Sequence, residues 1–172
     1  DMNILLTGGA GFIGTHTLVE LLGHGHEAVV IDNFSNSCRE ALSRAEELTG
    51  KDILFYEADI RDRAVLDRIF EEYPIDAVIH FAGLKAVGES VAKPIEYYDN
   101  NLVGTLVLLE AMRDHGVKKL IFSSSATVYG TPEQLPLTET CKVGGTTNPY
   151  GTSKYFQERM LEDGCVSDKE WS

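Results

Sequence analysis

Short apolar runs rich in Val, Ile, Leu and Phe recur along the chain and predict buried strands. Such runs are typical of a parallel sheet that is covered by helices on both faces. The runs lie at residues 3–7, 28–32, 53–56, 77–81 and 119–123.

Between these runs lie stretches whose apolar residues have helical spacing, at 12–22, 65–70 and 96–115. A last helix is predicted from Tyr150 to about Asp163, ending before Gly164, because Asn148 followed by Pro149 supplies a cap and a first-turn proline. The alternation predicts an α/β protein with a doubly wound parallel sheet and right-handed crossovers, the Rossmann dinucleotide-binding fold.

The end of the chain departs from this pattern, because no strand is predicted after the last helix. A dinucleotide fold of two halves usually has six or more strands. We therefore expect residues 1–172 to form one incomplete domain, truncated before its last strands.

Composition narrows the range of partners. The 172 residues include 15 Lys and Arg against 27 Asp and Glu, a net charge of −12, which disfavours nucleic acid. No apolar stretch approaches the ~20 residues of a membrane-spanning helix, so we expect a cytoplasmic protein without a membrane partner. Cys38, Cys141 and Cys165 are too scattered for a disulfide framework or a zinc site and are expected to be free thiols.

A glycine-rich turn joins the first strand to the first helix, with Gly8, Gly11 and Gly14 at three-residue spacing. One glycine permits the tight turn, one lets a pyrophosphate approach the backbone, and one lets helix and strand pack closely. The helix N-terminus then faces the phosphates with its N–H groups and its positive dipole end. A lone glycine triplet is weak, but its position between strand and helix favours a dinucleotide site over a structural turn.

Asp32 at the end of the second strand indicates which dinucleotide binds. A carboxylate there accepts hydrogen bonds from the ribose hydroxyls and repels a 2′-phosphate, so it favours NAD over NADP. Arg39 follows and could reach a phosphate, although a solvated arginine on a helix face is the simpler interpretation.

Tyr150 and Lys154 are four residues apart, which places them on one face of the predicted helix. An ordinary tyrosine is a poor base because its pKa is about 10, and a nearby ammonium stabilises the phenolate. The pair therefore suggests a base for an alcohol or sugar hydroxyl. Ser123, Ser124 and Ser125 end the fifth strand, where hydroxyls face the ligand crevice of such folds or satisfy the strand end itself.

A metal site is not predicted. The five histidines share no ligand spacing, and His80 lies in an apolar strand, where a hydrogen-bonded core histidine is the simpler interpretation.

With these features in place, the chain resembles the extended short-chain dehydrogenase/reductase family, and within it the enzymes that invert C4 of UDP-hexoses. The resemblance runs along essentially the whole chain. Its most specific stretches are HFAGLKAVGES at 80–90, YYDNN at 97–101, SSSATVYG at 123–130 and NPYGTSK at 148–154.

The resemblance implies roles for individual residues. Tyr150 would be the catalytic base, Lys154 would bind the nicotinamide ribose and tune Tyr150, and Ser125 would bond the sugar's 4-oxygen. Lys85, Ser125 and Tyr150 would contact substrate. The residues implied to contact NAD are Gly8, Gly11, Phe12, Ile13 and Gly14 near the pyrophosphate; Asp32, Asn33, Phe34, Ser35, Asn36 and Ser37 around the adenosine ribose; Asp59 and Ile60 at the adenine; and Phe81, Ala82, Gly83, Lys85, Asn100, Ser123, Tyr150 and Lys154.

The implied reaction is the NAD-dependent interconversion of UDP-galactose and UDP-glucose in galactose metabolism. In that branch of the family C4 is oxidised, the 4-keto sugar rotates in the site, and the sugar is reduced from its other face, which regenerates NAD. An intermediate that must rotate needs a roomy pocket, with UDP supplying binding energy from a distance. The uridine contacts are expected in a C-terminal domain that this chain lacks, so the chain alone is expected to turn over nothing.

Other functions remain open. A 4,6-dehydratase would need an Asp-Glu pair after the serine strand end, where this chain has Ala126 and Thr127. A nucleotide-sugar decarboxylase is harder to exclude. A non-catalytic NAD-binding module would have no use for Tyr150, Lys154 or Ser125. The resemblance also suggests a homodimer through the 96–115 helix and the Tyr150 helix, although these faces can equally pack within one chain.

Overall fold

The computed structural model describes residues 1–35 and 37–172, which form two compact units. Unit 1 comprises Asp1–Ala82, Leu106–Ser123 and Trp171–Ser172. Unit 2 comprises Gly83–Thr105 and Ser124–Glu170.

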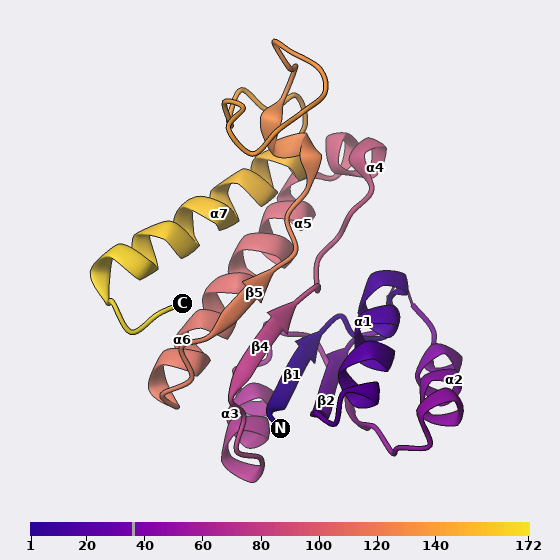
Figure 1. The fold of residues 1–172 in the computed structure, drawn as a ribbon. Helices are drawn as coiled ribbons and strands as arrows, with labels where there is room; N and C mark the ends of the chain where they lie inside the picture. Colours follow the sequence, from indigo (N-terminus) through magenta and orange to yellow (C-terminus); the bar gives the residue numbers. More distant parts are fainter. Residues whose placement is uncertain (36) are drawn as a thin grey trace. The chain divides into compact units, whose positions relative to one another are not determined.

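Unit 1 is built on a parallel sheet with strand order β3-β2-β1-β4-β5 (Figure 1). The order places the first strand at the centre of the sheet, as expected for a doubly wound fold. All five predicted strands are confirmed, and no strand end differs from its predicted position by more than one residue. The strands are β1 (Asn3–Thr7), β2 (Glu27–Asp32), β3 (Leu54–Glu57), β4 (Ala77–His80) and β5 (Leu120–Phe122).

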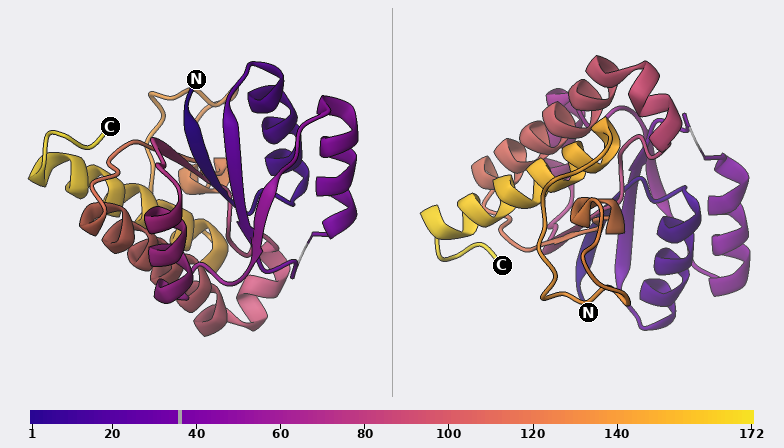
Figure 2. Two further views of the ribbon diagram at one scale, coloured as in Figure 1. Left: turned by 90° about the horizontal axis from the view of Figure 1, so that it is seen from below. Right: turned by 90° about the horizontal axis from the view of Figure 1, so that it is seen from above.

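Helices cover both faces of this sheet because successive side chains of β1 point to opposite sides. Leu5 faces α3 (Arg63–Glu72) and the part of α6 (Gly104–Asp114) that belongs to unit 1. Ile4 and Leu6 pack toward α1 (Phe12–Gly23) and α2 (Arg39–Thr49). Figure 2 shows these two helices, in indigo and purple, beside the strands of unit 1. Burial of each leucine side chain contributes about 1.5–3 kcal/mol to the stability of the fold. The packed core on both faces of the sheet therefore stabilises the strand from which the glycine turn begins.

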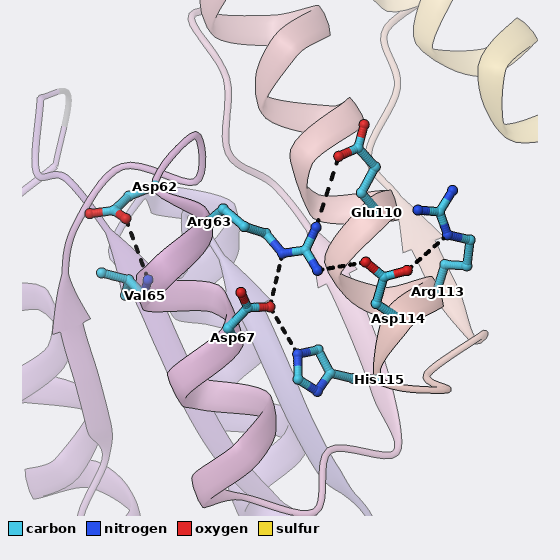
Figure 3. A network of polar contacts seen from close by, with 8 residues as sticks. All are labelled: Asp62, Arg63, Val65, Asp67, Glu110, Arg113, Asp114 and His115. Atoms are coloured by element: carbon cyan, nitrogen blue, oxygen red, sulfur yellow. Dashed lines mark hydrogen bonds and ion pairs between the residues drawn. The ribbon is translucent and has the colours of Figure 1, made fainter.

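A charge network joins α3 to α6 on the surface of unit 1 (Figure 3). The guanidinium of Arg63 donates to Asp67 at 2.8 Å and to Asp114 at 2.7 Å. His115 Nε2 lies 2.9 Å from the same Asp67 carboxylate, and its ring stacks on Phe70. Arg63 thereby links two helices that are distant in sequence.

The last two residues of the chain belong to the sheet unit. Ser172 donates its N–H to Lys118 O at 2.9 Å, and its carbonyl accepts the N–H of Leu120 at 2.8 Å. Trp171 packs against the core beneath α3 and α6. These two backbone hydrogen bonds attach the end of the chain to the start of β5.

Unit 2 is helical and corrects one prediction. The 96–115 stretch is not one regular helix: α5 (Pro94–Tyr98) runs into a π-helical turn η1 (Asp99–Val103) before α6 begins. A π-turn adds one residue to the helical turn and often marks a functional site. Periodicity alone did not reveal this insertion, nor the short helix α4 (Val87–Ala92).

The predicted end of the last helix is wrong. Helix α7 (Pro149–Ser167) passes through Gly164 and ends at Ser167, and the backbone becomes extended at Asp168. The Gly164 carbonyl accepts both Ser167 Oγ at 2.8 Å and the N–H of Asp168 at 3.1 Å, so the helix is capped one turn later.

Candidate functional site

The glycine-rich turn of unit 1 is shaped by close backbone contacts. Gly8 has φ +68°, and a Cβ there would lie 2.7 Å from the backbone N of Ala82. A Cβ on Gly14 would lie 2.6 Å from the Gly8 carbonyl oxygen. Among the described residues, the one atom within 4 Å of a Cβ on Gly11 would be the Gly8 oxygen, at 3.4 Å. Two glycines are therefore required by packing, whereas Gly11 leaves the turn open to a ligand.

The same turn fits a pyrophosphate. Gly11 is the N-cap of α1 and has no side-chain hydrogen bond to cap the helix within the described residues, so first-turn N–H groups are available to an anion. Phe12 and Ile13 are 82% and 54% exposed beside the turn. Such exposure of large apolar side chains suits a surface that a bound molecule covers.

Asp32 lies at the carboxyl end of β2 and braces this turn. Oδ2 accepts the N–H of Ala10 at 3.0 Å, and Oδ1 accepts the N–H of Phe34 at 2.8 Å and the hydroxyl of Ser37 at 3.1 Å. A carboxylate can accept about four hydrogen bonds, so these three from the described residues leave capacity for a ribose hydroxyl. Asp32 can therefore hold the turn and a ribose at once.

The segment after Asp32 forms a tight bend. Asn33 accepts the N–H of Ser35 at 3.1 Å, and Phe34 has φ +55°. Asn36, which was expected to contact the adenosine ribose, lies outside the described residues. Arg39 starts α2, and its guanidinium carbon lies 4.4 Å from the centre of the Phe55 ring.

Asp59 follows β3 and is held by Arg61, whose Nη2 donates to the carboxylate at 2.7 Å. Hydrogen bonds from Arg61 hold the pKa of Asp59 below its ordinary value. The Ile60 side chain is buried in the core, so any contact of Ile60 with adenine must come from its backbone.

The end of β4 is tied to β1 by side-chain hydrogen bonds. His80 is a satisfied core histidine, as predicted, because its Nδ1 bonds the Thr7 hydroxyl. Thr7 Oγ1 also accepts the N–H of Ala82 at 3.2 Å. The Phe81 side chain packs into the core on the α1 and α2 face, and the N–H of Ser123 donates to the carbonyl of His80 at 3.2 Å.

Unit 2 carries the predicted catalytic pair on α7. Tyr150 and Lys154 are 8% and 2% exposed and lie one helical turn apart. Burial, together with a smaller contribution from the positive charge of Lys85, lowers the pKa of Lys154 to about 8. Removal from water disfavours the charged form of an ammonium, which is why burial lowers this pKa.

Ser125 caps the 3₁₀ turn η2 (Ala126–Tyr129). Its Oγ accepts the N–H of Thr127 at 3.3 Å and the hydroxyl of Thr127 at 2.9 Å. A serine oxygen has two acceptor positions and one O–H. The Ser125 hydroxyl is therefore disposed to donate. A Cβ on Gly151 would lie 3.1 Å from the Thr127 carbonyl, so α7 approaches η2 closely at this glycine.

Sequence reasoning missed a buried polar network around the π-turn. The Asn101 amide accepts the N–H of Leu84 at 2.8 Å and donates to the Leu84 carbonyl at 3.1 Å and to Ser153 Oγ at 3.0 Å. Ser153 in turn donates to the Tyr150 carbonyl at 2.8 Å. Asn101 thus fixes the backbone next to Lys85, and Tyr97 fixes the other side by accepting the N–H of Ala86 at 3.1 Å.

The predicted residues fall into two sets. Unit 2 brings Gly83, Lys85, Asn100, Ser125, Tyr150 and Lys154 into one helical unit. Unit 1 holds Gly8, Gly11, Phe12, Ile13, Gly14, Asp32, Asn33, Phe34, Ser35, Ser37, Asp59, Ile60, Phe81, Ala82 and Ser123.

A parallel sheet with β1 at its centre, a glycine turn after β1 and an acid at the end of β2 define a dinucleotide-binding α/β protein. The sequence matches the NAD dependent epimerase/dehydratase family over residues 4–167. The chain belongs to this family.

Similar proteins are found in distant organisms. The chain is 61% identical to a UDP-glucose 4-epimerase of Bacillus subtilis over 99% of its length and 58% identical to one of Homo sapiens over 98%. A crystal structure of UDP-glucose 4-epimerase from Bifidobacterium longum in complex with NAD⁺ and UDP matches 99% of this chain and 51% of that chain, at 62% identity and TM-score 0.98. The chain spans about half the length of the curated relatives it matches, 50% of each of these two.

Proposed function

We propose that the protein is an NAD-dependent isomerase that interconverts UDP-galactose and UDP-glucose at C4 of the hexose, in galactose metabolism. The observation that carries the proposal is the buried pair Tyr150 and Lys154 on α7, in a chain that also has the glycine turn of a dinucleotide site. A binding module alone has no need of a buried lysine beside a buried tyrosine.

Three residues of unit 2 are assigned to the chemistry. Tyr150 takes the proton from the 4-hydroxyl of the sugar and later returns it. Lys154 donates to the nicotinamide ribose and stabilises the phenolate by its charge. Ser125 donates a hydrogen bond to the 4-oxygen, since Thr127 occupies its acceptor positions. Bound NAD supplies the redox chemistry by taking a hydride from C4 and giving it back.

Unit 1 is assigned to the cofactor. The glycine turn and the first-turn N–H groups of α1 hold the pyrophosphate, and Asp32 accepts from the adenosine ribose. The overall reaction would need no external oxidant, because the sugar product has the same oxidation level as the substrate.

Three further proposals concern the uridine contacts, the oligomeric state and the location of the protein. We place the uridine contacts in a C-terminal domain, since the curated relatives are about twice as long as this chain. We further propose a cytoplasmic homodimer formed through the 96–115 stretch and α7. None of the helices in the described residues has the length and apolar character needed to cross a bilayer.

The test uses the full-length gene product. Native mass spectrometry of the purified protein should show bound NAD, and proton NMR should show UDP-galactose converted to UDP-glucose without added cofactor. The assay should include UDP-N-acetylgalactosamine, because one structural relative, from Campylobacter jejuni, is named as a UDP-Glc/GlcNAc 4-epimerase.

Different products would overturn the proposal in different ways. Loss of water from the sugar would indicate a 4,6-dehydratase, and release of CO₂ from UDP-glucuronate would indicate a decarboxylase. Bound NAD with no turnover of any nucleotide sugar would indicate a binding module.

A further inference from the structure

Ser90 is a fully buried hydroxyl of α4, at 0% exposure, that contacts the backbone of the proposed base. Its Oγ accepts the N–H of Tyr150 at 3.1 Å and donates to the Val87 carbonyl at 2.6 Å. The donated bond orients the hydroxyl so that an oxygen lone pair is available to Tyr150.

This contact supplies a cap that the local sequence lacks. The first N–H groups of a helix have no partner within the helix. In α7, Pro149 has no N–H, and Asn148 Oδ1 accepts the N–H of Gly151 at 2.9 Å. The Tyr150 N–H between them is satisfied by a residue 60 positions away in sequence.

Tyr150 is consequently anchored on both sides of its peptide backbone. Ser90 holds its N–H, and Ser153 donates to its carbonyl at 2.8 Å. A tyrosine side chain that must meet a sugar hydroxyl within hydrogen-bond distance depends on the position of its Cα, and an error of 1 Å can cost about a hundredfold in rate.

We propose that Ser90 is a positioning residue for the proposed epimerase reaction, which sets the place of Tyr150 by capping its N–H from α4. The inference rests on the proposed function. The 80–90 stretch would then have two functions: Lys85 contacts the ligands, and Ser90 holds the Tyr150 backbone. Ser90 is a positioning residue and not a catalytic one, because in this role it contacts neither the reacting atoms nor the cofactor.

Thr105 provides a matched control. It is also a fully buried hydroxyl that bonds α7, donating to Gln157 Oε1 at 2.7 Å, but two turns beyond Tyr150. A purely structural role predicts similar losses for Ser90→Ala and Thr105→Val. A positioning role predicts that only Ser90→Ala changes catalysis.

The experiment compares kcat, KM, bound NAD and melting temperature in the full-length gene product. We expect Ser90→Ala to lower kcat about tenfold or more, with KM for UDP-galactose and NAD content within about twofold of the parent. Thr105→Val should keep kcat within about twofold, and Ser90→Thr, which restores a hydroxyl, should recover most of the lost kcat. Equal kcat losses in Ser90→Ala and Thr105→Val, or no loss in Ser90→Ala, would overturn the inference.

A second measurement needs no variant. The Tyr150 amide should exchange its hydrogen slowly in the parent protein, at least tenfold more slowly than the exposed first-turn amides of α2, despite its place in the first turn of a helix. Fast exchange at Tyr150 would refute the cap even if Ser90→Ala failed to fold. Failure of the proposed function is distinguishable, because the parent and Tyr150→Phe proteins would then be equally inactive while the amide stayed protected.

Discussion

The glycine turn of unit 1 and the start of α7 in unit 2 carry the two halves of the proposed chemistry, and they are built differently. The turn is shaped by backbone atoms: Gly8 and Gly14 leave no room for a Cβ, and Gly11 leaves a gap. The start of α7 is shaped by buried side chains, with Ser90, Asn101 and Ser153 holding the backbone around Tyr150. Added side-chain volume should therefore disrupt the glycine turn, whereas loss of a hydrogen bond should disrupt the start of α7.

The strongest test of the difference is Tyr150→Phe, which removes one oxygen from unit 2. General base catalysis contributes about 10²–10⁴ in rate, so turnover of UDP-galactose should fall by at least a hundredfold. Bound NAD, measured by native mass spectrometry, should be unchanged because the turn of unit 1 is intact. Normal turnover in the variant would remove Tyr150 as the base.

The difference also explains what could be predicted from sequence. The strands, the turn and the Asp32 position are local signals, because apolar runs and glycine spacing act over a few residues. The pairing of Tyr150 with Lys154 is local in the same sense, since it follows from helical periodicity. Ser90 and Asn101 gave no such signal, because their hydrogen-bond partners in α7 lie 60 and 52 residues away. The π-turn that contains Asn101 also interrupts the helical period.

Two glycine substitutions test whether backbone packing shapes the glycine turn of unit 1. Gly14→Ala puts a methyl group 2.6 Å from the Gly8 oxygen and should destabilise the fold by about 1–3 kcal/mol and abolish NAD retention. Gly11→Ala meets its nearest atom only at 3.4 Å, so it should fold normally and lose NAD affinity alone. Thermal unfolding should show a loss of stability for Gly14→Ala alone, whereas cofactor content should fall in both variants. Equal melting temperatures would contradict the packing assignment of Gly14.

Asp32→Ala tests the carboxylate that accepts a hydrogen bond from the glycine turn and is proposed to accept one from the adenosine ribose. Removal of the carboxylate frees the N–H of Ala10 and takes away the repulsion of a 2′-phosphate, so NAD affinity should fall by about tenfold and preference over NADP should relax. Glu57→Ala, at the end of the neighbouring β3, is the control and should change neither. Binding titrations with both dinucleotides give the ratio. An unchanged ratio would mean that Asp32 serves the turn only.

Lys154→Met should separate stability from function in unit 2. Burial lowers the pKa of Lys154 from 10.5 to about 8, so its charge opposes folding below pH 8, and the penalty fades as the pH rises toward 10.5. The methionine variant of the cofactor-free protein should therefore unfold at a higher temperature at pH 7, by the equivalent of roughly 1–3 kcal/mol, and lose most activity. The stability gain should be smaller at pH 10 than at pH 7. A gain that does not depend on pH would point to better packing instead of a removed charge.

The smallest effect is expected from the surface network of Arg63. Hydrogen bonds from its guanidinium hold the pKa values of Asp67 and Asp114 below their ordinary value, so these carboxylates stabilise the folded state above pH 4 and stop doing so as the pH falls below that range. Arg63→Met should lower the melting temperature slightly at pH 7, and the difference from the parent should shrink below pH 4. Arg159→Met, which removes an exposed arginine of α7, serves as the control and should have no measurable effect at either pH. An Arg63→Met deficit that persists at pH 3 would show that its aliphatic stem between α3 and α6, and not its charge, supports unit 1.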